Sequence, residues 1–192
     1  MVRRAHALCA VLLVAGPAWA GDAWVAHYRY QGAHGHCELT VVRDDTRAEY
    51  RGCGQPMRRW QQLGDGIELL ELDPRQDAVV RHSPGDLRAI GREPEWDRVA
   101  GIAPARLRAI LPSSGTGQAH GWASTQYRGQ DADGRTVDLE WLEQPALPAR
   151  YRIGGSADGE SFELERLQRL PAAEAFTALQ DLREIDIADA GD

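Results

Sequence analysis

Lysine is absent from this sequence, because all 22 of its basic residues are arginine. We attribute this absence to a coding bias towards G and C rather than to a binding device. Acidic residues outnumber the arginines, with 29 aspartates and glutamates and a formal net charge of −7. This excess of negative charge argues against a nucleic-acid partner and against electrostatic docking on anionic lipid.

Long apolar runs are also missing. The run from Ala7 to Ala15 covers about nine residues, whereas a membrane-spanning helix needs about 20. Arg3 and Arg4 precede it, and Ala18-Trp19-Ala20 follows it, in the order typical of a cleaved secretory signal peptide. We therefore expect cleavage after Ala20 and one domain over residues 21–192, in the periplasm, or secreted if the source has no outer membrane. Cleavage also removes two arginines and makes the net charge −9.

Cysteine is scarce, and the expected cleavage leaves only two of the three. Cys9 falls in the signal peptide, where the preceding His6-Ala7-Leu8 does not fit a lipid-attachment site. Cys37 and Cys53 remain, and an oxidising compartment is expected to join such an isolated pair as a structural disulfide. Closing a loop of about 15 residues stabilises a fold by about 3 kcal/mol. A metal-binding or redox pair would normally be spaced Cys-x-x-Cys.

Motifs for catalysis and for nucleotide binding are missing as well. No serine lies in a Gly-x-Ser-x-Gly elbow, and no glycine-rich phosphate loop leads into a helix. Ser113 and Ser114 are interpreted as ordinary residues of a loop. Asp138 and Glu140 are interpreted as the solvent-exposed face of a half-buried strand and not as an acid–base pair. We therefore expect a protein that is not an enzyme, with no catalytic residue and no cofactor.

A metal site is considered at His34 and His36, which lie one residue apart beside Cys37. Two imidazoles at that spacing can share an ion, but the third ligand would have to be a distant residue such as His82 or His120. We favour a polar hairpin tip and expect no metal. An exported metal-dependent hydrolase remains the least favoured alternative.

Alternation of apolar and polar residues predicts strands through much of the chain. A bulge at Gly52 is expected to bring Cys53 onto the face of Cys37. Asp65-Gly66, Asp133-Gly134 and Asp158-Gly159 predict hairpin turns between antiparallel strands that are neighbours in sequence. The predicted strands are residues 24–31, 37–42, 47–51, 57–63, 67–72, 78–82, 122–128, 136–142, 150–153, 162–167 and 182–187.

Helices are predicted in two regions only. One begins at Ser83-Pro84-Gly85-Asp86 and is broken by Pro94 and Pro104, with its best helix at Ala103–Leu111. The other covers Ala172–Leu179 after Pro171. Pro112–Gly121 is predicted to be a loop, and Asp189–Asp192 an acidic end. The fold class is α+β: a strongly curved antiparallel sheet, an unclosed half-barrel of about ten strands, with a few short helices over its concave face.

Large aromatic residues are plentiful on the predicted apolar faces. They can fill an ordinary core or line an apolar ligand cleft, since a curved sheet leaves a concave face that short helices do not fill. For the second interpretation, the expected ligand-binding wall comprises Trp24, Tyr28, Tyr30, Trp60 and Trp141.

The pattern resembles the LolA/LolB-type periplasmic lipoprotein-binding half-barrels, including the sensor domains of RseB/MucB-like regulators. The resemblance rests on the signal peptide, Tyr28-Arg29-Tyr30-Gln31-Gly32, the Asp-Gly turns, the helical insertion Gly85–Leu111 and the segment Leu147-Pro148-Ala149-Arg150-Tyr151. It implies an unclosed barrel whose concave face takes acyl chains or hydrophobic peptide under a lid of helices. The chain differs from the carriers in having no clear helix before its first strand.

We therefore expect a non-catalytic binding protein for an acyl chain, lipoprotein or hydrophobic peptide, which sequesters apolar surface from water. The alternative is an envelope protein-interaction or assembly factor with a filled core and no small ligand. The ligand, the partner and the oligomeric state are left open by the sequence. No membrane segment is expected after cleavage.

Overall fold

The computed structural model describes residues 21–32, 35–154 and 159–187. The expected signal peptide, His34, Asp158 and the acidic end Asp189–Asp192 lie outside the described residues. Within these ranges the chain forms twelve strands and four short helices. The predicted α+β class, with an unclosed and largely antiparallel sheet, is confirmed, although the sheet has twelve strands rather than about ten.

The first half of the chain is a meander of six strands that runs outwards from β1, in the middle of the sheet, to β6, next to one edge. Its strands are β1 (Asp22–Gly32), β2 (Gly35–Arg43), β3 (Arg47–Gly52), β4 (Gln55–Leu63), β5 (Gly66–Asp73) and β6 (Ala78–His82). The predicted Asp65-Gly66 turn joins β4 to β5, and Leu63 pairs with Gly66 across it.

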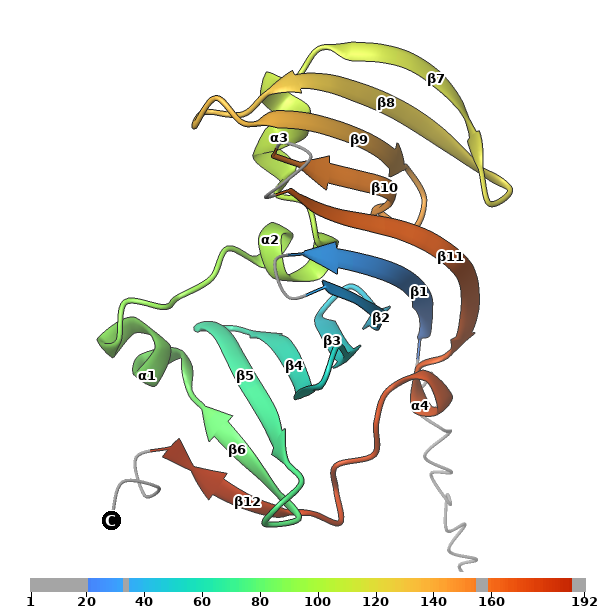
Figure 1. Ribbon diagram of the computed structural model, residues 1–192. Coiled ribbons are helices and arrows are strands. Elements are labelled where there is room, and N and C mark those ends of the chain that lie inside the picture. The colour runs from blue at the N-terminus through green and yellow to red at the C-terminus, as the bar shows by residue number, and fades with distance from the viewer. Residues whose placement is uncertain (1–20, 33–34, 155–158, 188–192) are drawn as a thin grey trace, which may run out of the picture.

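Three helices then carry the chain from β6 to the opposite edge of the sheet. They are α1 (Pro84–Ala89), α2 (Trp96–Gly101) and α3 (Ala105–Ile110). The predicted start at Ser83 is confirmed by a capping box, in which Ser83 Oγ accepts from the Asp86 amide while the Asp86 carboxylate accepts from the Ser83 amide. Figure 1 shows α1 to α3 on the open, concave side of the curved sheet.

The second half of the sheet runs back towards β1. It contains β7 (Ser113–Ala119), β8 (Trp122–Gln130), β9 (Thr136–Leu142), β10 (Leu147–Ile153) and β11 (Glu160–Pro171), followed by α4 (Ala172–Ala175) and β12 (Arg183–Asp186). The strand order is β12-β6-β5-β4-β3-β2-β1-β11-β10-β9-β8-β7. The predicted pairing of sequence neighbours is therefore wrong at two places, between β6 and β7 and between β11 and β12, because β11 pairs with β1 and β12 pairs in parallel with β6.

Two local predictions are also corrected. The predicted loop at Pro112–Gly121 is largely strand β7, which pairs with β8 from Ser113 to Ala119. The predicted helix at Ala172–Leu179 ends at Ala175, since Phe176 is extended, with φ −81° and ψ 148°. In both cases contacts with neighbouring strands decide the backbone conformation. Strand β8 pairs with β7, and Arg51 of β3 and Arg59 of β4 donate to the backbone oxygens of Ala175 and Thr177.

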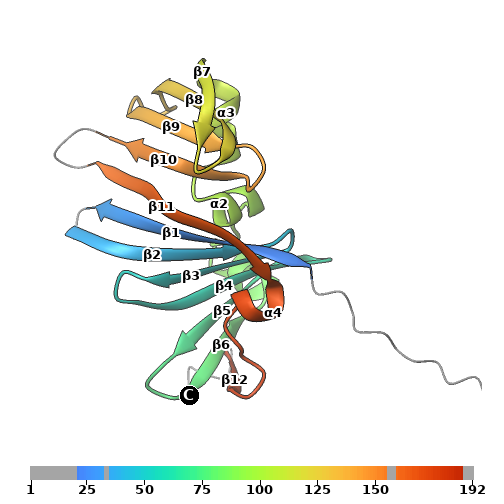
Figure 2. The same cartoon turned by 90° about the vertical axis from the view of Figure 1, so that its right-hand side faces the viewer.

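The core lies on both faces of the sheet. On the concave face, Tyr28, Leu142 and Leu147 form one buried cluster, and Leu107 of α3 packs with Trp141 in a second. On the convex face, α4 covers Val25 and Val42. Figure 2 shows α4 on the side of the sheet opposite α2. This arrangement leaves the part of the concave face near β2 to β4 and α2 less completely filled.

Candidate functional site

A pocket of about 410 Å³ opens on the concave face between α2 and the strands β1 to β4 and β11. This volume falls in the range of small-molecule sites, about 300–1,000 Å³. Exposed charged side chains, Arg58, Arg98 and Glu160, are found among its lining residues and form its rim. We call it the aromatic pocket, and its larger apolar side chains are Tyr30, Leu39, Tyr50, Trp60, Val99, Ile102 and Phe162.

Phe162 of β11 is the centre of a group of aromatic rings at the pocket wall. Its ring centroid lies 4.8 Å from that of Tyr30 and 5.9 Å from that of Tyr151. The Tyr30 hydroxyl donates a hydrogen bond of 3.1 Å to Glu160 Oε1. Burial, together with this hydrogen bond, raises the pKa of Tyr30. The wall is therefore a set of neutral rings, and the Tyr30 hydroxyl is directed towards Glu160 at the rim.

The helix α2 is fixed above the pocket by two side chains from the sheet. The Tyr50 hydroxyl donates to the backbone oxygen of Val99. Arg43 Nη1 donates to the backbone oxygens of Ala100, at 3.2 Å, and Ala146, at 2.9 Å. Burial lowers the pKa of Arg43 and raises that of Tyr50. The bonds to Val99 and Ala100 occupy carbonyl groups at the end of α2 that have no partner inside the helix, and the bond to Ala146 joins Arg43 to the turn between β9 and β10.

Ile102 follows α2 in a strained conformation, with φ 63° and ψ −55°. Positive φ is a true outlier for a β-branched residue and costs about 1–3 kcal/mol. Its side chain packs against both buried clusters of the concave face and also lines the aromatic pocket. The surrounding packing therefore holds Ile102 where it shapes the pocket wall.

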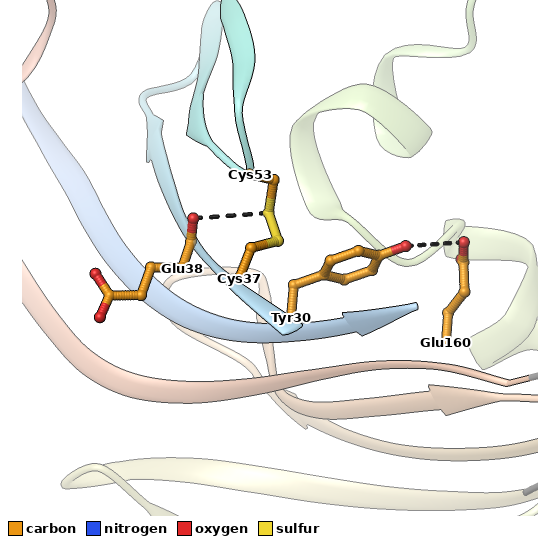
Figure 3. The surroundings of a disulfide bond; sticks show 5 residues. All are labelled: Tyr30, Cys37, Glu38, Cys53 and Glu160. Carbon is orange, nitrogen blue, oxygen red and sulfur yellow. Dashed lines mark hydrogen bonds between the residues drawn. A yellow bond between two sulfur atoms is a disulfide. The ribbon is translucent and has the colours of Figure 1, made fainter. Parts of the chain in front are cut away.

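The predicted disulfide between Cys37 and Cys53 is present, with the two Cα atoms 5.0 Å apart. Figure 3 shows that it lies beside Tyr30 and links β2 to the turn between β3 and β4. The bulge expected at Gly52 is confirmed, because the β3–β4 register shifts between Tyr50 and Gly52. The amide of Cys53 then donates to the Glu38 backbone oxygen at 3.0 Å, and Cys53 itself lines the aromatic pocket.

The five residues of the predicted wall occupy three different environments. Tyr30 and Trp60 line the aromatic pocket. Tyr28 and Trp141 are 1% and 2% exposed and belong to the packed core, where the Tyr28 hydroxyl donates to the Pro148 backbone oxygen at 2.8 Å. Trp24 packs edge-on against the Trp122 ring at a centroid distance of 5.0 Å. The structure thus brings only Tyr30 and Trp60 together at this pocket.

Sequence reasoning missed most of the remaining wall. Tyr50 and Leu39 stand on the apolar faces of predicted strands, so alternation alone could have indicated them. Phe162 could have been found only from the pairing of β1 with β11, which places it opposite Tyr30. Val99 and Ile102 lie between two prolines in a region of mixed spacing that offered no clear signal.

The described residues that were considered for catalysis or metal binding are absent from the lining of the aromatic pocket. Asp138 pairs with Arg128 at 2.8 Å, and Glu140 accepts from Ser124 Oγ at 3.0 Å. His36 is exposed at the start of β2. Across residues 21–32, 35–154 and 159–187, no group of three or more His, Cys, Asp or Glu side chains is arranged to hold a metal ion. No helix in that part of the chain is long and apolar enough to cross a membrane.

Comparison with known proteins identifies the fold alone. No protein-family model matches the chain, and no curated protein matches its sequence. An uncharacterized conserved protein from Thermus thermophilus matches at a TM-score of 0.52 and 10% identity, over 85% of this chain and 90% of that one. A chain of the Pseudomonas aeruginosa MucA/MucB complex matches at a TM-score of 0.50 and 12% identity, over 88% and 60%.

A third structure, PNGF-II, matches at a TM-score of 0.46 and 9% identity, over 88% of this chain and 32% of that one. The present chain spans about a third of PNGF-II and 60% of the matched chain of the MucA/MucB complex. The half-barrel fold that the sequence resembles is shared with the MucA/MucB structure, at an identity that shows the fold and nothing finer.

Proposed function

We propose that this chain is an exported, non-catalytic binding protein that shelters an acyl chain or a comparable apolar group in the aromatic pocket. The observation that carries the proposal is the composition of that pocket, in which aromatic and aliphatic walls enclose about 410 Å³ while charged side chains remain at the rim. Apolar walls with a few polar groups at the edge are typical of sites for small apolar ligands.

The energy for binding comes from the removal of apolar surface from water. Each buried methylene group contributes about 0.8 kcal/mol, which corresponds to about a fourfold change in affinity. Because α2 is already fixed by the bonds from Tyr50 to Val99 and from Arg43 to Ala100, the pocket exists before the ligand arrives. Little of the binding energy is then spent on ordering the protein.

The test is a titration of the purified protein with nonionic alkyl maltosides of 8, 10 and 12 carbons, each below its micellar concentration. We expect saturable one-to-one binding, with Kd falling about fourfold for each added methylene until the chain exceeds the pocket. An affinity that does not depend on chain length, or no saturable binding at all, would overturn the proposal.

Mass spectrometry of the exported protein is expected to give Gly21 as its first residue.

Interaction with an envelope protein is the second candidate. It is favoured by the fold match to a chain of the MucA/MucB complex. A partner that binds through the outer surface would leave alkyl-maltoside binding unchanged, whereas a partner that inserts an apolar side chain into the aromatic pocket would compete with it. Competition between the two distinguishes these modes.

A further inference from the structure

A second pocket, of about 460 Å³, lies beside the aromatic pocket. Its apolar surface includes Leu107 and Ile110 of α3, and Ile110 is 54% exposed. The two pockets share four lining residues, which are Arg98, Ile102, Glu160 and Phe162. They therefore form one continuous groove along the concave face.

The carboxylates of the second pocket already have partners. Asp131 and Asp133 pair with Arg135, at 2.7 Å and 2.9 Å. Glu160 accepts the hydrogen bond of the Tyr30 hydroxyl. Asp131 and Asp133 therefore share one guanidinium group, and the Glu160 carboxylate is held by a neutral hydroxyl.

The arginines contributed by the helical segment are different. Arg98 of α2 and Arg106 of α3 both line the second pocket. Neither side chain has a hydrogen bond or an ion pair among the residues that the structure describes. Two arginine side chains without an ion-pair partner in the described ranges therefore face one apolar groove, in a chain with a net charge of −7.

We propose that the groove binds a single-chain amphiphile with an anionic headgroup, its alkyl chain in the aromatic pocket and its headgroup at Arg98 and Arg106. This inference rests on the proposed function and adds the charge of the ligand to it. The guanidinium groups suit a carboxylate or a phosphate, because each presents several donors in a plane. A cationic headgroup at the same place would instead meet two arginines that have no ion-pair partner in the described ranges.

The test compares three amphiphiles with the same 12-carbon chain in calorimetric titrations at low salt: dodecanoate, dodecyl maltoside and dodecyltrimethylammonium. We expect dodecanoate to bind about five- to tenfold more tightly than the maltoside, as two half-exposed ion pairs allow, and the cation to bind most weakly. The preference should shrink as salt screens the charges.

For the variant R98Q/R106Q the readout is the ratio of its two dissociation constants, and it should bind dodecanoate and the maltoside equally. The matched control is R75Q/R92Q, because Arg75 and Arg92 are also exposed, have no side-chain hydrogen bond or ion pair in the described ranges, and line neither pocket. Both variants carry the same change in net charge, so the control should keep the preference for dodecanoate.

The outcomes separate this inference from the proposed function. If the wild type binds dodecanoate and the maltoside equally, or if R98Q/R106Q keeps the preference, the headgroup assignment is wrong and the alkyl-chain site stands. If the wild type binds none of the three amphiphiles saturably, the proposed function fails as well.

Discussion

Glu49 of β3 is wholly buried, and its Oε2 accepts a hydrogen bond of 2.8 Å from Arg59 Nε on the neighbouring strand β4. The other carboxylate oxygen accepts from Arg51 Nε at 2.6 Å and from Thr177 Oγ1 at 2.7 Å. The two guanidinium groups also donate to backbone oxygens of Ala175 and Thr177. This network attaches the segment after α4 to the convex face of the strands that form the aromatic pocket on their other face.

Replacement of Glu49 by glutamine is expected to destabilise the protein by about 3 kcal/mol, since breaking a buried ion pair leaves uncompensated charge. Urea denaturation followed by circular dichroism measures the change. The control is Glu165→Gln, because Glu165 and its partner Arg29 keep 40% and 60% of their side-chain surfaces exposed. That variant should lose less than about 1 kcal/mol. Equal losses in the two variants would show that the buried network is not a major source of stability.

The position at which α4 ends shows what the sequence could and could not predict. Local signals were sufficient for the hairpins at Asp65-Gly66 and Asp133-Gly134, for the capping box at Ser83 and for the bulge at Gly52, because each depends on residues within a few positions. The end of α4 depends instead on Arg51 and Arg59, which are more than 100 positions away along the chain.

The same distinction applies to the candidate site. Alternation along β1 places Trp24, Tyr28 and Tyr30 on one face, and this is correct. It does not say which part of that face the helices and the second half of the sheet will cover. Leu142 and Leu147 bury Tyr28, whereas Tyr30 is left at the pocket. The Gly-rich segment of β7 carries little strand propensity and becomes a strand because β8 supplies its hydrogen bonds.

Alkaline pH is expected to destabilise the fold through its buried tyrosines. Burial raises the pKa of Tyr28 and of Tyr50 above the ordinary value, so both phenols stay protonated in the folded chain. Unfolded tyrosines ionise near pH 10, so above that pH the unfolded state binds fewer protons and the free energy of unfolding falls as pH rises. Each tyrosine contributes at most about 1.4 kcal/mol per pH unit.

Urea denaturation at pH 9, 10 and 11 measures this dependence. The variant Tyr50→Phe should show a shallower decline than the wild type, because it has one fewer buried phenol. A free energy of unfolding that stays constant over this range would contradict the assignment of these two hydroxyls as neutral and buried.

Gly52 is expected to tolerate no side chain. Its φ is +113°, and a Cβ atom there would lie 2.2 Å from the Glu38 backbone oxygen. Gly52→Ala should therefore destabilise the protein by about 2–4 kcal/mol, from a close contact with backbone as well as positive φ. Gly54 is the matched control in the same turn, with φ +66° and nothing within 4 Å of its Cβ position.

Gly54→Ala should lose only about 1 kcal/mol, the cost of a left-handed alanine. Thermal denaturation of both variants with the disulfide intact gives the comparison. Similar melting temperatures would mean that the turn moves to relieve the contact between residue 52 and Glu38, and that the bulge is not fixed by this glycine.

Filling the aromatic pocket from α2 should abolish ligand binding without unfolding the protein. Val99 lines the pocket and is partly exposed, so the larger ring in Val99→Trp can occupy the space that an alkyl chain would take. Its backbone oxygen still accepts from Tyr50, which keeps α2 attached. We expect at least a tenfold rise in the Kd for dodecyl maltoside, with a melting temperature near that of the wild type.

The matched control is Ile90→Trp, because Ile90 follows α1, is 58% exposed and lies outside the groove. It adds the same ring to the same helical region and should leave the Kd unchanged. If Val99→Trp binds the maltoside as the wild type does, the alkyl chain lies elsewhere on the protein. If both variants lose binding, the effect comes from the helical segment as a whole and not from occupation of the aromatic pocket.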